Sequence, residues 1–570
     1  MLNLDHIKEM TEALGQQLKA GRSPKGIWRG KLSSSAISTA VSIFALYQTD
    51  QKRHNELIHA GARWLRSTMW PDGSWGDTPE SRSNMTATLL SHAALFALNE
   101  ATTETQTFLA ARFGGITNEK IVQGVLSYYG KDLTFSVPIL VMCALSGLIT
   151  DWRHIPRLPF ELAILPQRFF RFLQLPVVSY AIPALIAVGI LRHRKGKKGI
   201  GFTIRESFVT PSLKVLETLQ PSGGGFLEAA PLTAFVTICM SSAGYNQHSV
   251  TQRAIGFLTD NVRPNGSWPI DTDLACWVTA LSIKALGEDV PDREFLLQTV
   301  KNQAFRYRHP FTGAKEGGWG WSDLPGAVPD ADDTAGNLIA LHILQRGVYC
   351  PEAEKGVRWL LDLQNKDGGI PTFCKGWGRL PFDSSSPDLS AHALAAFERW
   401  YEVLPERLQR KCRKSIRRIL RWMQKTQASD GSWTPLWFGD QDTPNEHAPV
   451  YGTAVAVEYL NLSTLSPARE LAAKGAAYLV SVQNEDGGWG GAKGYPSKVT
   501  LTARALSALA HSPDKDRETL ARGVDYLYRR FKEGTLGAPE PIGLYFARLW
   551  YSEELYNPAF ALHALKNLLM

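Results

Sequence analysis

Three carboxylates stand close together in the segment PDADDTAGN, at Asp330, Asp332 and Asp333. They precede the apolar helical pattern LIALHILQ, and acidic residues are common in the first turn of a helix, where they cap free N–H groups and interact favourably with the helix dipole. Capping alone does not need three of them. Because carboxylates packed this closely repel one another, we expect one to hold a proton near neutral pH. A protonated carboxylic acid beside a cavity can act as a general acid, so this cluster is the first candidate for chemistry.

A recurring phrase along the chain supplies the elements that would position this cluster. A helix end that carries an aromatic residue and Leu, often followed by Gln, leads into a Gly-x-Trp turn. Clear copies begin at Gly61, Ala254, Gly356, Ser415 and Lys474, and shortened copies at Gly223, Glu316 and Arg522. In the C-terminal half the copies recur at intervals of roughly 50–65 residues, which is typical of a repeat architecture.

Helical patterns fill the intervals between these copies. Stretches such as TATLLSHAALFAL, TDLACWVTALSIKAL and TLTARALSALA place apolar residues at three- and four-residue steps. Few runs alternate as a strand would, so each repeat comprises one or two helices and a Gly-rich turn. The sequence therefore predicts an all-α fold, and its 570 residues predict two or more domains.

Two strongly apolar runs depart from the repeat, at residues 134–149 and 175–191, and the basic segment RHRKGKK follows the second run directly. The second run contains two prolines and falls short of the roughly 20 apolar residues that a spanning helix needs, so a membrane span is not expected. Apolar residues beside basic ones favour a segment that lies in the membrane interface. A buried core helix is an equally good interpretation of either run.

Composition excludes several classes of protein. Hydrophobic residues make up 44% and charged residues 20%, which describes a folded chain with a formal charge of +8. The six cysteines show no CxxC spacing, so neither a disulfide framework nor a zinc finger is indicated, and a reducing compartment is expected. The N-terminus has no apolar signal-peptide core. No nucleic-acid motif is present, and the basic run from Arg407 to Arg421 is interpreted as a solvated helix face.

The tryptophan-bearing repeats and the aspartate cluster together resemble the QW motifs and the DxDD motif of squalene-hopene cyclases and related class II triterpene cyclases. The resemblance extends from about Gly61 to the C-terminus. It implies two α/α-barrel domains that enclose an apolar cavity, at residues 30–264 and 265–570, with an N-terminal helix (1–29) packed on the second. It also implies monotopic attachment to the cytoplasmic side of a membrane through a segment at about 134–191, and a lipid substrate taken from the bilayer.

The resemblance assigns roles to individual residues. Asp332 would protonate a terminal double bond of a linear polyprenyl chain such as squalene, while Asp330 and Asp333 would supply a negative field that tolerates the new carbocation. His392 in PDLSAH would hydrogen-bond the acid, although a single histidine on a helix is more often a core residue. Tyr451 in VYGTAVAV corresponds to a tyrosine of the polar network near the acid. Cys374 lies near a cysteine of the same network.

Aromatic residues are the candidates for substrate contacts, because the face of an aromatic ring stabilises a cation by roughly 0.5–2 kcal/mol. Trp321 matches a cation-stabilising aromatic residue of the family, and Phe373 stands where the family has a tyrosine in the cavity wall. Taken alone, each aromatic residue is more often part of a packed core than of a cavity lining. Further candidates for the lining are Trp437, Phe438, Tyr545, Phe546, Trp550 and Tyr551. The tryptophans of the repeats are interpreted as structural: Trp75, Trp268, Trp433 and Trp489.

Departures from the family pattern leave the product open. Thr68 occupies a usual Gln position, Ile370 a usual Trp position, and Ile270 stands where a Trp precedes Asp-Thr in the family. The product could therefore be hopene-like or only partially cyclised. Protonation, cyclisation and proton loss leave the redox state unchanged, so no cofactor is expected.

Other classes of protein also contain helical repeats of this kind. The Asp-x-Cys pair of a protein prenyltransferase zinc site and the DDxxD magnesium site of a class I terpene synthase are not found, so no metal is expected. Two alternatives remain open: a class II diterpene-type cyclase acting on a prenyl diphosphate, and a non-catalytic lipid-binding repeat protein. The resemblance also leaves open whether the chain forms a homodimer.

Overall fold

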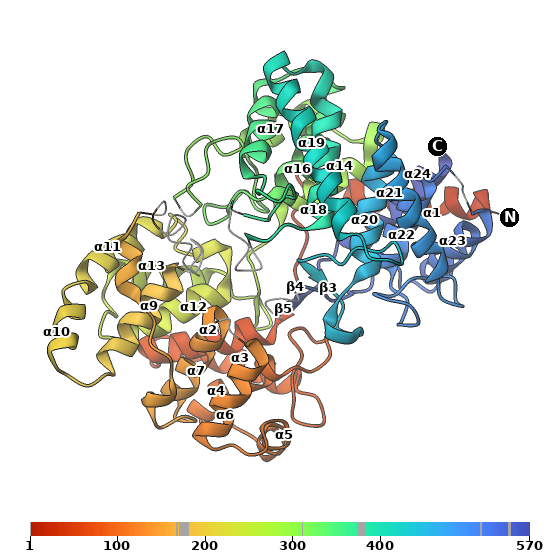
Figure 1. The fold of residues 1–570 in the computed structure, drawn as a ribbon. Coiled ribbons are helices and arrows are strands. Elements are labelled where there is room, and N and C mark those ends of the chain that lie inside the picture. Colours follow the sequence, from red (N-terminus) through yellow and green to blue (C-terminus); the bar gives the residue numbers. More distant parts are fainter. Residues whose placement is uncertain are drawn as a thin grey trace. The chain divides into compact units, whose positions relative to one another are not determined.

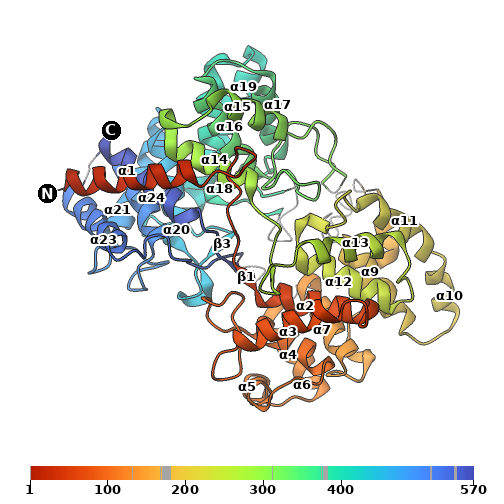
Figure 2. The same ribbon diagram turned by 180° about the vertical axis from the view of Figure 1, so that it is seen from behind.

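The computed structural model describes residues 2–130, 133–166, 169, 182–310, 312–373, 375, 383–513, 516–544 and 549–570. The chain forms two compact units (Figures 1 and 2). One, here called the C-terminal barrel, comprises residues 1–31, 273–323 and 327–570, and the other, the N-terminal barrel, comprises residues 32–272 and 324–326. The boundary in the middle of the chain thus follows Thr272, slightly beyond the expected 264.

The C-terminal barrel is built on a closed ring of inner helices, each packed against the next, with the last returning to the first. The ring runs in the order α14 (Ala275–Leu286), α16 (Ala331–Gln345), α18 (Pro387–Trp400), α20 (Pro449–Asn461), α22 (Val499–Ala510) and α24 (Tyr556–Leu569). Small and apolar residues cover nearly every face of these helices, and α22 is buried from Val499 to Ala510. A helix that is apolar all round is stable only inside such a ring.

Outer helices surround this ring and alternate with the inner ones along the chain. They are α1 (Leu4–Ala20), α15 (Arg293–Gln303), α17 (Pro351–Leu363), α19 (Glu406–Thr426), α21 (Ser466–Ser481) and α23 (Arg517–Lys532). These helices are amphipathic: α19 buries Leu408, Cys412, Ile416, Ile419 and Met423 at three- and four-residue steps and exposes its basic residues. The basic run from Arg407 is accordingly a solvated helix face. The N-terminal helix α1 packs on α24 and α23.

In the described part of the N-terminal barrel, inner helices close into a ring in the same way. They are α2 (Ala36–Asp50), α4 (Met85–Ala97), α7 (Leu133–Ser146), α9 (Ile182–Arg194) and α12 (Ala230–Ser242). Other α-helices described in this unit are α3 (Asn55–Ser67), α5 (Thr103–Phe113), α6 (Asn118–Tyr129), α10 (Ile200–Glu206), α11 (Val209–Leu219) and α13 (Ser249–Asp260).

The two apolar runs of the sequence lie largely within this inner ring. Helix α7 is buried from Ser136 to Cys143, and α9 from Ile182 to His193. Their apolar character therefore fills the core of the N-terminal barrel, whereas residues 170–181 of the expected membrane segment lie outside the described residues. Among the helices that the structure describes, none is long and apolar enough to cross a membrane.

Short strands form a small antiparallel sheet in each of the two units. Strand β1 (Ser34–Ser35) pairs antiparallel with β2 (Trp268–Pro269) in the N-terminal barrel. In the C-terminal barrel, β4 (Ile542–Leu544) lies between β3 (Phe438–Gly439) and β5 (Leu549–Tyr551) in a small antiparallel sheet, with Phe438 opposite Leu544 and Ile542 opposite Tyr551.

The tryptophan of each repeat ties three elements together. In the copy at Trp489, the indole N–H donates to the carbonyl of Leu479 at 2.8 Å, and the backbone N–H donates to Thr502 Oγ1 at 3.0 Å. Leu479 belongs to the last turn of outer helix α21, whose carbonyls have no partner within the helix, and Thr502 lies on inner helix α22. Equivalent pairs of bonds occur at Trp75, Trp268 and Trp433. The repeat is therefore a clamp between the end of one helix and an inner helix packed beside it.

The glutamine of the repeat extends this clamp to the next outer helix. The Gln483 side-chain amide donates to Gly487 O at 2.8 Å and to Thr519 O at 2.9 Å, and Gln220, Gln364 and Gln427 make the same two kinds of bond. Gly487 has a φ of +87°, and a Cβ there would lie 2.3 Å from the Arg522 carbonyl, so the turn requires glycine. Thr68, at the Gln position of the first copy, bonds back to Trp64 O in its own helix.

Replacing Trp489 with Phe tests the clamp. The substitution removes the indole N–H and leaves the Leu479 carbonyl buried without this donor, so we expect the free energy of unfolding to fall by about 1–3 kcal/mol in chemical denaturation. Trp70→Phe is the control, because Trp70 is 43% exposed, and a change within about 0.5 kcal/mol is expected there. Equal losses in the two variants would contradict the clamp.

Candidate active site

The aspartate cluster lies at the N-terminal end of α16, and a repeat clamp sets its position. The Trp319 N–H donates to Thr334 Oγ1 at 3.0 Å, and the Asp330 N–H donates to the Trp319 carbonyl at 3.0 Å. Asp330 is the N-cap of the helix and accepts from the Asp333 N–H at 2.9 Å. Asp330 and Asp333 are buried, whereas the side chain of Asp332 is 22% exposed. Asp332 is thus the member of the cluster that can reach a neighbouring molecule.

Asp332 and His392 are in direct contact. The Nδ1 atom of His392, on the neighbouring inner helix α18, lies 2.6 Å from Oδ1 of Asp332. The face of the imidazole stacks on Tyr459 with ring centroids 4.6 Å apart, and Trp277 meets it at a steep angle at 6.4 Å. Gly336 lets α16 approach this group, because a Cβ there would lie 3.1 Å from the Trp277 ring. The structure therefore brings together the expected acid and its expected histidine partner.

Burial shifts the protonation of the carboxyl groups around Asp332. Burial and the neighbouring charge of Asp330 raise the pKa of Asp333 well above its ordinary value. Burial also raises the pKa of Asp330 to about 7 and that of Asp388, in the first turn of α18, to about 6. Burial therefore disfavours the charged form of all three of these carboxyl groups.

Tyr451 lies in the first turn of the next inner helix, α20. It is buried, its ring lies 4.9 Å from that of Phe438, and the Arg504 guanidinium lies 5.6 Å from it. Burial raises the pKa of Tyr451 well above its ordinary value, and the charges of Asp332 and Asp388 contribute in the same direction. Tyr451 therefore keeps its hydroxyl proton and can both donate and accept a hydrogen bond.

The expected aromatic lining falls into two groups. Trp321, Phe373 and Trp437 form a half-buried run, with successive ring centroids 6.1 and 5.4 Å apart. Tyr551 is buried, and its hydroxyl lies 3.2 Å from that of Tyr556.

Not every expected aromatic residue belongs to a lining group. Trp550 is fully buried, which is typical of a core residue. Tyr545, Phe546 and Cys374 lie outside the described residues.

Several residues near the acid were not predicted as site residues. Asp388, Tyr459 and Trp277 were missed, as was a buried ion pair between Lys284 and Glu458, 2.5 Å apart. One sequence signal could have revealed this pair. A charged residue inside a helix that is otherwise apolar all round, such as Lys284 in TALSIKAL or Glu458 in AVAVEYL, must find a buried partner.

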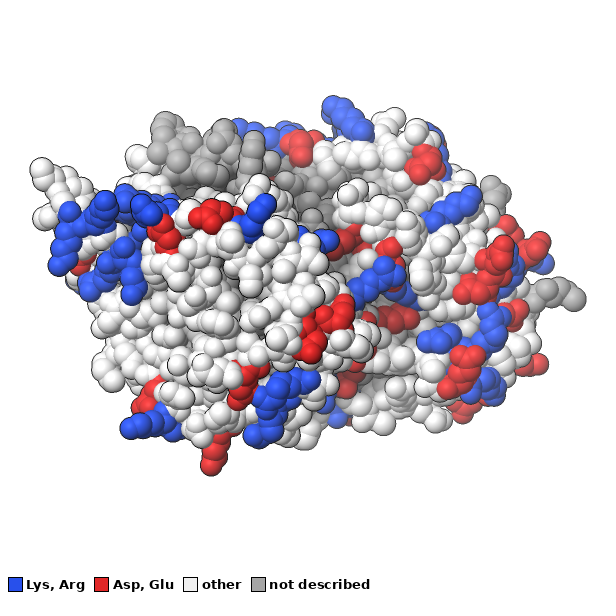
Figure 3. Space-filling model, turned by 90° about the horizontal axis from the view of Figure 1, so that it is seen from below, with Lys and Arg blue, Asp and Glu red and all other residues white. Residues whose placement is uncertain are grey.

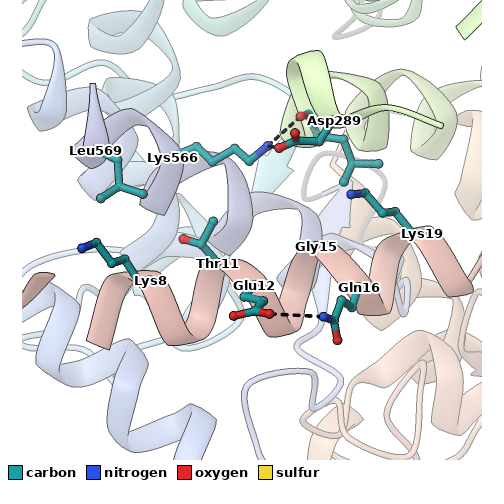
Figure 4. A pocket seen from close by; sticks show the side chains of 10 residues that line it. Lys8, Thr11, Glu12, Gly15, Gln16, Lys19, Asp289, Lys566 and Leu569 are labelled. Carbon is teal, nitrogen blue, oxygen red and sulfur yellow. Dashed lines mark hydrogen bonds and ion pairs between the residues drawn. The ribbon is translucent and has the colours of Figure 1, made fainter. Parts of the chain in front are cut away.

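A shallow surface groove lies apart from this site, and the described residues form no metal site. Within the described ranges, no group of three or more His, Cys, Asp or Glu side chains could hold a metal ion. A shallow groove of about 310 Å³ lies along α1 and α24 and shares none of the residues above (Figure 4). At the edge of the groove, Lys566 Nζ donates to Asp289 Oδ2 at 2.6 Å. The groove is lined by Lys8, Thr11, Glu12, Gly15, Gln16, Lys19, Leu286, Asp289, Lys566 and Leu569.

Comparison with protein families gives matches in both halves of the chain. Residues 275–569 match the model of the squalene-hopene cyclase C-terminal domain, and residues 11–122 match that of the squalene-hopene cyclase N-terminal domain.

Individual relatives are distant in sequence. Enfumafungin synthase from Hormonema carpetanum is 23% identical over 93% of this chain, and the chain spans about half of that protein, 46% of its length. Squalene–hopene cyclase from Zymomonas mobilis is 21% identical, with 99% of this chain and 96% of that protein aligned. Among solved structures, ent-copalyl diphosphate synthase from Streptomyces platensis has a TM-score of 0.61 at 17% identity, covering 99% of this chain and 100% of that one, which shows a shared fold.

The raised pKa of Asp330 predicts how stability depends on pH. An unfolded Asp has a pKa of about 3.9, so between about pH 4 and pH 7 the folded chain binds more protons than the unfolded chain, and the free energy of unfolding falls as pH rises. Asn at 330 cannot ionise but can still cap the helix. We therefore expect Asp330→Asn to be more stable than the wild type at pH 8, on the order of 1–3 kcal/mol, and less pH-dependent.

Chemical denaturation at pH 4.5 and pH 8 measures this effect. Asp516→Asn is the matched control: Asp516 caps α23 at the surface, and hydrogen bonds from the α23 backbone lower its pKa, so its stabilising effect is lost as pH falls. A wild type and an Asp330→Asn variant with the same pH dependence would show that Asp330 does not titrate as described.

Proposed function

Because the chain belongs to the squalene-hopene cyclase family, we propose that it catalyses class II, protonation-initiated cyclisation of a linear polyprenyl hydrocarbon such as squalene to a hopene-like or partially cyclised triterpene. The chain is a terpene cyclase by family, and the choice of substrate and product is the proposal. The observation that carries it is the 2.6 Å contact between Asp332 and His392 at the end of the inner ring. Asp332 is the proton donor in this scheme.

The proton transfer needs no other reagent. The π electrons of the terminal double bond take the proton from Asp332, which leaves a tertiary carbocation and an Asp332 carboxylate. The carboxylate keeps the hydrogen bond from His392 Nδ1–H, and this bond strengthens as negative charge develops. Successive double bonds then attack the cation. The last cation loses a proton, so one proton is taken up and one is released, and the product is an isomer of the substrate. A hydrogen bond that is stronger in the product carboxylate than in the acid favours transfer of the proton.

The aromatic residues would guide the cation after protonation. The faces of Trp321, Phe373 and Trp437 can each contribute roughly 0.5–2 kcal/mol to a passing cation. Their ring centroids are 5.4–6.1 Å apart and successive rings meet edge to face, so the three side chains form one aromatic cluster against which a chain could fold. A chain held in a folded conformation loses less entropy on ring closure. These three side chains, with Phe438 and Tyr551, are the proposed substrate contacts, and Tyr451 belongs to the proposed polar network near the acid.

Turnover of squalene by detergent-solubilised protein tests the proposed function, with mass spectrometry of the extract as the readout. We expect an isomeric cyclised hydrocarbon from the wild type and at least a 100-fold lower rate from Asp332→Asn, which keeps the shape but has no transferable proton. Asp362→Asn is the control, since Asp362 is exposed on α17 and its pair with Lys315 lies at the surface. It should retain full activity.

Shorter polyprenes and prenyl diphosphates are tested in parallel. Cyclisation of a prenyl diphosphate in place of squalene would support the diterpene-type alternative and leave Asp332 as the acid. No turnover of any of these compounds by folded wild-type protein would overturn the proposal and favour a lipid-binding function.

Attachment to the cytoplasmic surface of a membrane is part of the proposal, and helix α10 supports it. Ile200 and Ile204 on this helix are 85% and 59% exposed, and Lys195, Lys197 and Lys198 precede it directly. Basic side chains gather at the end of the N-terminal barrel that carries α10 (Figures 1 and 3). Exposed apolar residues beside lysines suit the interface of a bilayer with anionic lipids. The five described free cysteines are all buried, which suits a reducing compartment.

Vesicle sedimentation tests this attachment. A lysine near an anionic surface contributes about 1 kcal/mol, so replacing Lys195, Lys197 and Lys198 together with Gln should weaken binding to phosphatidylserine-containing vesicles by roughly 100-fold. The matched control replaces the exposed residues Lys411, Lys414 and Lys425 of α19. Equal binding by the two triple variants would contradict an attachment through α10.

A further inference from the structure

A cluster of charged side chains is buried in the inner ring of the C-terminal barrel, around Glu458 of α20. Glu458 is 1% exposed. Its Oε1 lies 2.5 Å from Lys284 Nζ of α14 and 3.0 Å from His563 Nε2 of α24, and its Oε2 lies 3.7 Å from the guanidinium of Arg504 on α22. One carboxylate therefore joins four of the inner helices.

Contacts connect this cluster to the acid through a single aromatic ring. Lys284 Nζ donates to Tyr459 Oη at 3.1 Å and lies 4.6 Å from the centre of the Tyr459 ring. The ring of Tyr459 is stacked on the His392 imidazole, with centroids 4.6 Å apart and planes 9° apart. His392 in turn contacts Asp332 at 2.6 Å. Direct contacts therefore lead from Glu458 through Lys284, Tyr459 and His392 to the acid.

Stability alone is a poor explanation for such a cluster. Moving ions out of water costs free energy, and apolar replacements of a buried ion pair are often neutral or stabilising. This cost is visible at Lys284, because burial lowers the pKa of its ammonium group to about 8. The surrounding helices are otherwise composed of small and apolar residues, which could have filled the same space. The cluster instead fixes the position and the orientation of Tyr459.

The orientation of His392 matters for the proposed reaction. Only an imidazole with its proton on Nδ1 can donate to Asp332 Oδ1 and leave the acid proton on the other oxygen. Free rotation about Cβ–Cγ, or a shift of the proton to Nε2, would break this arrangement. The described packing opposes rotation with the flat face of Tyr459 and with Trp277, whose ring meets the imidazole at an interplanar angle of 71°.

We propose that Tyr459, anchored by Lys284 and Glu458, is a positioning residue that holds the His392 imidazole in the plane in which Nδ1–H donates to Asp332. This inference rests on the proposed function, since it concerns the same acid. Tyr459 itself takes no part in proton transfer to the substrate. Its hydroxyl is bound by Lys284, and its ring provides the surface on which the imidazole lies.

Steady-state kinetics of Tyr459 variants test the positioning role. Tyr459→Leu removes the ring, and we expect kcat to fall roughly 10- to 100-fold while KM changes less than about twofold, because the substrate contacts remain. Tyr459→Phe keeps the stack but loses the bond to Lys284, so a smaller loss is expected. Tyr526→Leu is the matched control: Tyr526 is a buried tyrosine of α23 whose hydroxyl donates to Ser497 O at 3.0 Å, and this variant should lose stability but keep its kcat.

A double-mutant cycle separates positioning from a general structural effect. If Tyr459 acts through His392, then Tyr459→Leu should cause no further loss of kcat in a His392→Asn background. Multiplicative losses in the double variant would overturn the proposal.

The imidazole ¹⁵N spectrum of His392 gives a readout that does not need substrate. Its signals are assigned by their disappearance in His392→Asn, and we expect a single Nδ1–H tautomer in the wild type and a mixture in Tyr459→Leu. An unchanged His392 spectrum in Tyr459→Leu would overturn the positioning role. The expected spectra together with a wild type that converts no polyprene would support the positioning role and refute the proposed function.

Discussion

The contact between Asp332 and His392 is the interaction on which the site depends, and it joins residues 60 positions apart on two inner helices. A contact of 2.6 Å tolerates little relative movement of α16 and α18. Each of these helices is held at the turn that precedes it. Trp319 N–H binds Thr334, two residues from Asp332, and Ile370 N–H binds Ser390, two residues from His392. The clamps that build the barrel therefore also fix the geometry of the acid and its partner.

The same arrangement continues around the ring. Trp433 N–H binds Thr453, two residues after Tyr451, and Trp489 N–H binds Thr502, two residues before Arg504. On each of four successive inner helices, a polar side chain of the site therefore lies two residues from the Thr or Ser whose hydroxyl accepts the hydrogen bond of the clamp. A repeated clamp thus anchors the polar groups of the inner ring near one another, and burial there raises the pKa of carboxyl groups such as Asp333 and Asp388. The fold and the chemistry share one set of hydrogen bonds.

Local sequence was enough to predict part of this arrangement. The aspartate cluster and the Gly-x-Trp turns are short motifs whose roles depend on a few neighbouring residues, and the alternation of turns with helical patterns predicts an all-α repeat fold. Hydropathy could not distinguish an interfacial segment from an inner helix, because both are strongly apolar. In the described parts of the two runs, closure of the ring buries α7 and α9. Contacts such as Lys284 with Glu458, 174 positions apart, likewise exist only once the ring has closed.

Protonation of the terminal double bond starts the proposed cyclisation, and the incorporation of solvent deuterium tests this step most directly. The exchangeable carboxyl proton equilibrates with solvent before each turnover. Cyclisation in D₂O should therefore yield a product that carries one deuterium, located at the carbon of the former terminal double bond that received it. A cyclised product without deuterium, or with deuterium at other positions only, would contradict protonation of the terminal double bond as the initiating step.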